Sequence, residues 1–352
     1  MVQLDTLNPA GRSHDIFFFS RMNNYKVEDF LSLYKEKKVF EYFFPNLHGL
    51  HIDAFPLFNQ TMGKSFLDKR NQKFVEVFDA TYPNLQNKLL NYLANVESIN
   101  SSDIKKLAEL KEFVELKDKL PFMKPLEVLF MLGKITVKER DHNFRKTFTK
   151  TENYHQKEND NKISDILLQK LILRLRSYPV ILTKFRSQKH KDYVKPKNLR
   201  HLDILINVKN PEDDKVSLIK LDDTNYTFIV PVNWKSLLKE SYDNNLRAIA
   251  PLDPIVWDRG QLNLIFDFDY VWEVYKPANK RKFGYYVYPL LFQDKFVGKL
   301  ECKYTRKSNN LKLFNINFES NYQKDDFDKP LSILSESWKT ILSADEVEID
   351  YT

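Results

Sequence analysis

The stretch between residues 250 and 304 decides the fold of the C-terminal part of this chain. It reads APLDP (250–254), WDR (257–259), FDFDY (266–270), YKPANKRKFGYY (275–286) and DKFVGKL (294–300). From Pro251 onward we expect β-structure, because the residues from 296 to 304 follow the two-residue period of a half-buried strand. Further strands are predicted over 283–292 and 311–318, around turns at 293–295 and 308–310. These strands predict a curled sheet or small barrel. A helix over 328–342 would cover it through a buried stripe of Leu331, Leu334, Trp338 and Ile341.

The other informative segment is a Gln-hydrophobic-Asp triplet, Gln3-Leu4-Asp5. By itself such a triplet indicates little, and the plainest alternative is a pair of solvent-exposed polar residues at the end of a strand. In an extended backbone, however, residues two apart point to the same face, so Gln3 and Asp5 would lie together with Leu4 buried behind them. The triplet is followed, in order, by Asn8, Arg12, Ser13-His14, Phe19-Ser20-Arg21 and Val39-Phe40-Glu41-Tyr42.

Taken together, these motifs and their order resemble the AlkZ/YcaQ-type DNA glycosylases, in the branch that carries Gln-hydrophobic-Asp. The resemblance implies a tandem winged-helix architecture and an enzyme that removes bulky alkylated purines from DNA and unhooks interstrand crosslinks. It also implies that Gln3 and Asp5 are the catalytic residues. In the family, helices precede this motif, whereas here it begins two residues after Met1. We therefore expect either a start site upstream of Met1 or a truncated first domain.

The chemistry of base removal explains why these two residue types suffice. Breaking an N-glycosidic bond builds positive charge on the deoxyribose, so the site needs an anion near the sugar and a group that holds water. Asp5 would supply the anion, and the Gln3 amide would hydrogen-bond the water or the sugar-phosphate oxygen. An N7-alkylated purine is already cationic and leaves without a general acid. No lysine is adjacent in sequence, which favours attack by water over a Schiff base and predicts a monofunctional glycosylase that leaves an abasic site without a cofactor.

The bulk composition agrees with a folded protein that binds a polyanion. The chain has 352 residues, 42% of them apolar, and a formal net charge of +7. It has no run of about 18 apolar residues and no secretion signal, and its single cysteine, Cys302, excludes an internal disulfide. A cytoplasmic, nucleoid-associated monomer is therefore expected. The segment 184–200 carries seven basic residues and one acid, which indicates either a phosphate-binding surface or a solvated lysine-rich face.

The resemblance and the basic clusters together define a set of expected DNA contacts. For His14 the alternative is a hydrogen-bonded structural histidine, and Tyr285, Tyr286 and Tyr288 would either stack on bases or belong to the core. Asp258 and Arg259 are a possible ion pair at a junction. His48, His51 and Asp53 are spaced like metal ligands, but no other cluster supports them, and no metal site is expected. The expected DNA contacts are Asn8, Arg12, His14, Arg21, Arg145, Lys195, Lys197, Arg259, Lys280, Arg281 and Lys282.

Hydrophobic periodicity and caps predict the remaining elements. The chain begins extended, and helices are expected over 27–34, 36–44 and 124–132. A further helix is expected from Leu85, with an apolar repeat at Leu89, Leu93 and Val96, and another begins at Ser101. Two short strands over 133–137 and 145–149 would form a wing. A second cycle would comprise a helix over 163–175, the basic segment, and strands over 216–219 and 226–230.

The predicted fold is therefore α+β, with tandem winged-helix domains followed by a small β-barrel-like domain with a terminal helix. The predicted divisions are a partial first winged helix with the catalytic motif (1–75), a second winged helix (76–158), a third (159–247) and the C-terminal β-rich domain (248–352). The leading functional prediction is a repair glycosylase acting on duplex DNA. The alternative is a non-catalytic winged-helix DNA-binding or regulatory protein descended from such an enzyme.

Overall fold

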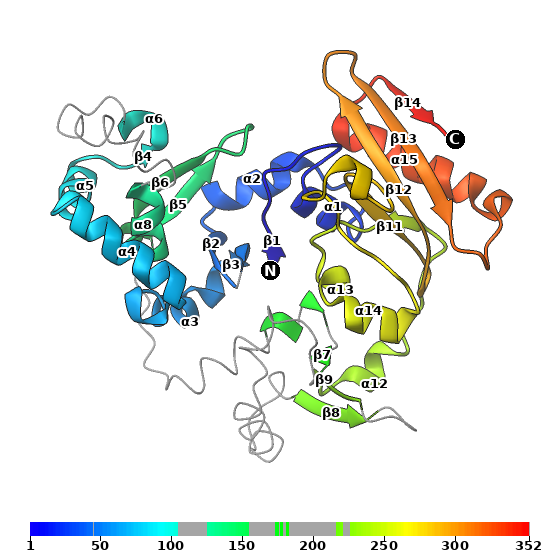
Figure 1. Ribbon diagram of the computed structural model, residues 1–352, viewed down its shortest axis with the longest axis horizontal. Coiled ribbons are helices and arrows are strands. Elements are labelled where there is room, and N and C mark those ends of the chain that lie inside the picture. Colours follow the sequence, from blue (N-terminus) through cyan, green and yellow to red (C-terminus); the bar gives the residue numbers. More distant parts are fainter. Residues whose placement is uncertain are drawn as a thin grey trace. The chain divides into compact units, whose positions relative to one another are not determined.

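The computed structural model describes residues 1–44, 46–104, 125–154, 173–175, 177–178, 181–182, 216–220 and 226–351. The chain forms two compact units (Figure 1). We call Met1–Val27 together with Ile163–Thr352 the terminal unit, and Glu28–Lys162 the inner unit. Two predicted features lie outside the described residues. One is the helix over 163–175, apart from its last three residues, and the other is the basic segment with Lys195 and Lys197.

The inner unit consists of short helices packed with antiparallel strands. Helix α5 buries Leu85, Leu89 and Leu93 on one face, which confirms the predicted repeat, although the helix ends before Val96. Strands β5 and β6 form the predicted hairpin, and β4 adds to it in the order β4-β6-β5. The elements are α2 (Val27–Lys35), β2 (Val39–Phe43), β3 (Leu47–His51), η1 (Ile52–Ala54), α3 (Phe55–Asn59), η2 (Lys64–Phe66), α4 (Lys69–Thr81), α5 (Leu85–Asn95), β4 (Ile99–Asn100), α6 (Ser101–Ile104), α8 (Pro125–Met131), β5 (Ile135–Arg140), β6 (Lys146–Lys150) and α9 (Thr151–Tyr154).

The predicted helix over 36–44 is wrong, because this segment forms strand β2 and pairs with β3. Helix α2 ends at Lys35, and Lys37 has a left-handed backbone with φ of 54°, which interrupts the helix. The following residues, Val39 to Phe43, are β-branched, aromatic or acidic, and the first four of them are buried. Such residues suit a strand that is covered on both faces.

The terminal unit contains a five-stranded sheet in the order β10-β11-β12-β13-β14, in which β14 pairs parallel to β13 and the other pairs are antiparallel. The predicted strands β8 and β9 pair in a separate sheet, in the order β7-β9-β8. The elements are β1 (Val2–Gln3), α1 (Ser13–Phe19), β7 (Ile181–Leu182), β8 (Val216–Lys220), β9 (Thr227–Pro231), α12 (Trp234–Leu237), β10 (Leu246–Ala248), α13 (Pro254–Trp257), α14 (Arg259–Phe266), η5 (Ala278–Lys280), β11 (Val287–Phe292), β12 (Lys295–Thr305), β13 (Asn310–Phe318), η6 (Lys324–Phe327), α15 (Asp328–Leu342) and β14 (Glu346–Ile349).

Helix α15 covers the five-stranded sheet and contacts both of its edge strands, β10 and β14 (Figure 1). It has the predicted bounds, and Leu331, Leu334 and Trp338 are buried as expected, while Ile341 is only partly buried. The indole of Trp338 packs edge-on against Tyr288, with ring centroids 5.0 Å apart. This contact lies in the main core of the terminal unit.

Two expectations about the C-terminal part are wrong, and one feature explains both. The segment after Asp253 is helical rather than extended, and it forms α13 and α14. Strand β12 is buried at every position from Phe296 to Cys302 and is therefore not half-buried. Residues of α13 and α14, including Val256 and Leu262, form a second core with Phe296. Because these helices cover the other face of the sheet, the central strand has no exposed side over this length.

The predicted mixed α+β class and a curled C-terminal sheet are confirmed. The assignment of individual winged-helix domains, the three boundaries between the four predicted divisions and a closed barrel stay predictions.

Candidate functional site

The N-terminal segment that carries Gln3 and Asp5 is attached to the C-terminal sheet. The carbonyl of Pro9 accepts a hydrogen bond from the backbone N–H of Tyr304 at 2.8 Å, and the carbonyl of Ala10 accepts one from the Trp338 indole at 2.7 Å. Ala10 is fully buried in the main core of the terminal unit. The first residues of the chain are therefore positioned by its last hundred residues.

Asp5 is a partly buried carboxylate. Its Oδ1 accepts a hydrogen bond from the backbone N–H of Leu7 at 3.3 Å, and its Oδ2 is buried with no hydrogen-bond partner among the described residues. Burial raises the pKa of Asp5, although the backbone N–H groups of Leu7 and Thr6 oppose the shift. A desolvated anion with an unsatisfied oxygen is poorly stabilised by its surroundings, and it gains the most from a cation that forms beside it.

Tyr286 lies in the electrostatic neighbourhood of Asp5. Burial, followed by the Asp5 carboxylate, raises the pKa of Tyr286. Tyr286 belongs to the basic motif near residue 280, so the structure brings the N-terminal triplet close to the far end of that motif. Gln3 is also buried, at the end of β1. The regular strand stops at Gln3, and Leu4 and Asp5 follow it without regular secondary structure.

The loop from Tyr275 to Tyr286, which we call the basic loop, is held by two buried carboxylates. Glu273 accepts hydrogen bonds from the backbone N–H groups of Lys282 at 2.8 Å and Phe283 at 2.7 Å. Glu301 accepts hydrogen bonds from those of Tyr285 at 2.6 Å and Tyr286 at 3.0 Å. Hydrogen bonds to a buried charge are the stronger kind, so the conformation of the loop is fixed before any ligand binds.

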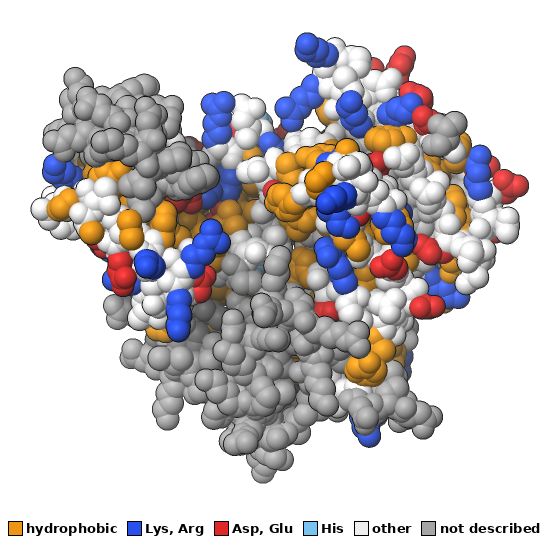
Figure 2. All heavy atoms as spheres, viewed as in Figure 1, with side chains coloured by type: hydrophobic (Ala, Val, Ile, Leu, Met, Phe, Trp, Pro, Cys, Tyr) orange, Lys and Arg blue, Asp and Glu red, His pale blue; other side chains and the backbone are white. Residues whose placement is uncertain are grey.

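The basic side chains of this loop remain at the surface. Lys280 is exposed, Lys282 lies 3.2 Å from Asp269, and the Arg281 guanidinium is 4.8 Å from the centre of the Tyr285 ring. Figure 2 shows Lys and Arg side chains beside apolar surface over this part of the molecule. Of the three tyrosines predicted either to stack on bases or to belong to the core, Tyr286 and Tyr288 are buried in the core, whereas Tyr285 is 42% exposed.

Comparison with known proteins agrees with this arrangement. The family described as "DNA glycosylase AlkZ-like" matches residues 1–178 and 216–319. This chain belongs to the AlkZ-like DNA glycosylase family. The matched range includes Gln3, Asp5 and the whole basic loop. The sequence resemblance is thereby confirmed, and with it the assignment to DNA glycosylases and DNA repair.

A solved structure, the Streptomyces sahachiroi DNA glycosylase AlkZ, shares the fold of this AlkZ-like protein. The TM-score is 0.58 at 12% sequence identity, and the match covers 92% of this chain and 85% of the Streptomyces chain.

Arg12 and His14 lie around the first turn of α1, inside the AlkZ-like terminal unit. Arg12 immediately precedes the helix and is 9% exposed, and His14 is 1% exposed. The His14 Nε2 lies 3.8 Å from Asp15 Oδ1, which also accepts a hydrogen bond from the Tyr25 hydroxyl at 2.7 Å. This burial favours the structural alternative for His14. A DNA contact by either residue stays a prediction.

Arg21 forms an ion pair within the AlkZ-like protein. Its guanidinium donates two hydrogen bonds to the fully buried carboxylate of Asp253, at 2.6 and 2.9 Å, and lies 4.0 Å from the centre of the Phe17 ring. Asp253 also caps α13 by accepting a hydrogen bond from the Ile255 N–H. Arg21 thus connects the end of α1 to the start of α13.

We expect Arg21→Gln to lower the free energy of unfolding by about 2 kcal/mol, because it leaves the buried Asp253 carboxylate without its cation. Thermal unfolding followed by circular dichroism would measure this, with Arg306→Gln, an exposed arginine, as the matched control. An unchanged melting temperature together with weaker, less salt-sensitive duplex binding would instead assign Arg21 to the DNA surface.

The remaining predicted contacts are spread over both units. Arg259 is exposed at the start of α14, and Asp258 caps that helix by accepting a hydrogen bond from the Gln261 N–H at 3.0 Å. The ion pairs found among the described residues do not include the predicted pair of Asp258 and Arg259. Arg145 is exposed next to the turn of the β5–β6 hairpin, in the inner unit. Asn8 lines one pocket with Arg281 and Lys282, while Lys195 and Lys197 lie outside the described residues.

Sequence reasoning missed Glu273 and Glu301. No local pattern marks a carboxylate that binds backbone N–H groups ten or sixteen residues away, and only the tertiary structure shows it. Within the described ranges, no group of three potential ligands could hold a metal ion. In the same ranges, no helix has the length and apolar content needed to cross a membrane.

Proposed function

We propose that this AlkZ-like protein hydrolyses the N-glycosidic bond of alkylated purines in duplex DNA, of the N7-alkylguanine type, and leaves an abasic site. The observation that carries the proposal is the Asp5 carboxylate, which is partly desolvated, has one unpartnered buried oxygen, and lies near the end of the basic loop. Crosslinked purines are substrates of the same chemical kind, and we include them in the proposal.

In this mechanism the bond between C1′ and the purine nitrogen breaks first, and its electron pair leaves with the base. An N7-alkylated purine is cationic, so it departs as a neutral molecule. The positive charge that remains on the sugar is stabilised by Asp5, and this interaction exists only near the transition state. The Gln3 amide holds the attacking water, which forms the new bond to C1′ and releases its proton to Asp5 or to solvent.

DNA binding would use the exposed cations around this site. Lys280, Arg281 and Lys282 lie on a loop whose backbone is already fixed, so little conformational entropy is lost when they meet phosphates. Arg259 is exposed and would extend the contact, and Asn8 would act nearer the N-terminal segment. Arg145, which is exposed in the inner unit, would make a contact of its own. Contacts by Arg12 and His14 stay predictions, because both side chains are buried. We propose that the protein binds DNA as a monomer.

The decisive experiment uses the full chain and a duplex with one N7-methylguanine. We expect abasic sites to accumulate at the modified position, detected as strand breaks after alkaline treatment, with no breaks before that treatment if the enzyme is monofunctional. A duplex with guanine at the same position is the control. Salt-sensitive binding of both duplexes without any base release would support the non-catalytic DNA-binding alternative.

A further inference from the structure

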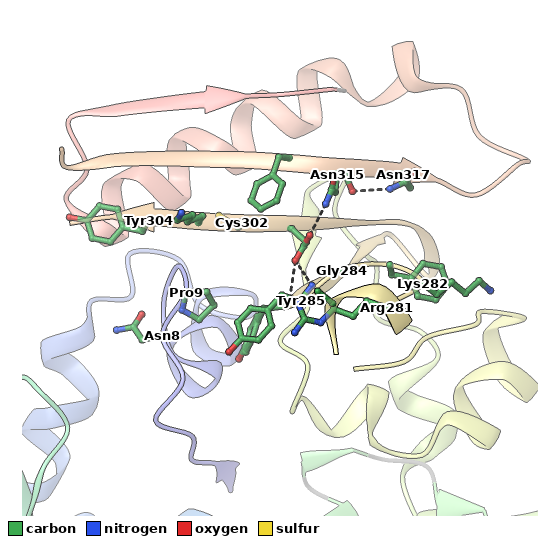
Figure 3. A pocket seen from close by; sticks show the side chains of 16 residues that line it. Asn8, Pro9, Arg281, Lys282, Gly284, Tyr285, Cys302, Tyr304, Asn315 and Asn317 are labelled. Carbon is green, nitrogen blue, oxygen red and sulfur yellow. Dashed lines mark hydrogen bonds between the residues drawn. The ribbon is translucent and has the colours of Figure 1, made fainter. Parts of the chain in front are cut away.

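A pocket with a volume of about 770 Å³ opens between the basic loop, the N-terminal segment and strands β12 and β13 (Figure 3). All of its lining residues belong to the terminal unit. Asn8 and Pro9 form one side, Arg281 and Tyr285 another, and Asn315 lies on the strand above them. A volume of this size accommodates a small organic ligand.

One wall of the pocket is rigid because Glu301 connects its parts. In addition to the N–H groups of Tyr285 and Tyr286, Glu301 accepts a hydrogen bond from the Asn315 side chain at 2.6 Å. Gly284 has a φ of 142°, and a Cβ at this position would lie 2.3 Å from the Glu301 carboxylate. The glycine therefore permits the close approach that joins the loop to the sheet.

The groups that face the pocket suit a nucleotide. Tyr285 offers an exposed aromatic ring, and the Arg281 guanidinium beside it supplies a planar cation. Lys303 adds a second exposed positive charge on β12. The side chains of Asn8 and Asn315 carry both donors and acceptors. Aromatic rings bind the faces of bases, cations bind phosphate, and carboxamides hydrogen-bond base edges.

We propose that this pocket is a nucleotide-binding site that takes one unpaired nucleotide of the bound DNA, with its base on Tyr285 and its phosphate near Arg281 and Lys303. The base must be unpaired, because a ring can stack on its face only when the base has left the duplex stack. This inference rests on the proposed function, because that function makes DNA the ligand. Tyr286 lines the pocket and also neighbours Asp5, so a nucleotide held here would belong to the same DNA that reaches the catalytic carboxylate.

The test uses undamaged DNA, so that catalysis does not enter. The full chain is titrated, by fluorescence anisotropy at one fixed salt concentration, against an intact duplex and against the same duplex with a single-nucleotide bulge. We expect the wild-type protein to bind the bulged duplex about tenfold more tightly, which is what one base–aromatic stack supplies. Tyr285→Ala should remove this preference and leave the affinity for the intact duplex unchanged, while Tyr285→Phe should retain it.

Tyr275→Ala is the matched control. Tyr275 lies on the same loop and is 85% exposed, but it does not line the pocket. Equal affinities of the wild-type protein for the two duplexes would overturn the proposal. So would a loss of bulge preference in Tyr275→Ala that matches the loss in Tyr285→Ala. Because no alkylated base is present, this test is independent of catalysis. A protein that releases no base can still prefer the bulged duplex, and a protein that releases base can still lack that preference.

Discussion

Asp5→Asn is expected to lower the single-turnover rate of alkylpurine release about 100-fold or more, with little change in duplex affinity. The asparagine keeps the shape of the side chain but cannot neutralise the charge that develops on the sugar, and removing one preorganised stabilising group of this kind typically has an effect of this size. Quantifying abasic sites over time, with enzyme in excess over a duplex carrying one N7-methylguanine, measures the rate. Equal rates for the variant and the wild type would remove Asp5 from the mechanism.

The matched control is Asp53→Asn, because His51-Ile52-Asp53 imitates the N-terminal triplet in sequence while Asp53 has an exposed side chain. This control should release base at the wild-type rate. The pH dependence gives a second check. Since the pKa of Asp5 is raised from its ordinary value of 3.8, the wild-type rate should fall on acidification with a midpoint above that value.

The same pKa shift sets the sign of the stability change in Asp5→Asn. Protonated Asp5 is favoured by the fold, so its contribution to stability is present below the ordinary pKa and is lost as the pH rises through the raised value. At neutral pH the ionised carboxylate destabilises the folded protein. The variant should therefore melt at the same temperature as the wild type or slightly higher, which separates a catalytic loss from a folding defect.

Arg140→Met is expected to destabilise the inner unit by about 3–5 kcal/mol, because it leaves a buried carboxylate without its cation. Glu41 is fully buried, and it accepts hydrogen bonds from Arg140 Nη2 at 2.7 Å and from the Tyr34 hydroxyl at 2.6 Å. The Arg140 guanidinium also lies 3.8 Å from the centre of the Phe144 ring. Thermal and urea unfolding would measure the loss.

Two further variants test that explanation. Lys138 lies on β5, as Arg140 does, and forms a surface ion pair with Glu97. Lys138→Met removes the cation of this pair, and the melting temperature should not change. Glu41→Leu combined with Arg140→Met replaces the buried pair by apolar groups, and it should recover most of the stability lost in the single variant. A double variant as unstable as Arg140→Met alone would contradict the assignment of the loss to the unpaired Glu41.

Acidification should act on the same pair. Burial raises the pKa of Glu41, but Arg140, followed by Lys146 and Tyr34, outweighs burial, and the net shift is downward from 4.5. The stability from ionised Glu41 is therefore present above that pH and is lost as the pH falls. The wild-type protein should lose more stability on acidification than the double variant does.

Local sequence patterns correctly predicted the elements in which buried residues recur at one regular spacing. Helix α15 has the expected bounds because its apolar residues recur at helical spacing, and α5 buries the expected leucines. The predictions failed where both sides of an element are covered. The strand from Val39 is buried at its first four residues, and helix α13 exposes none of its residues, so neither pattern distinguished helix from strand.

The sequence by itself determined the family, the candidate catalytic pair Gln3 and Asp5, and the basic motif near residue 280, because residue identity and order are properties of the chain alone. Only the tertiary structure decided which of these residues meet. The burial of Asp5, its position beside Tyr286 and the attachment of the loop to Glu301 depend on contacts between residues far apart in sequence. Desolvation and hydrogen bonding act through space, and a linear pattern carries no record of the neighbours that folding supplies.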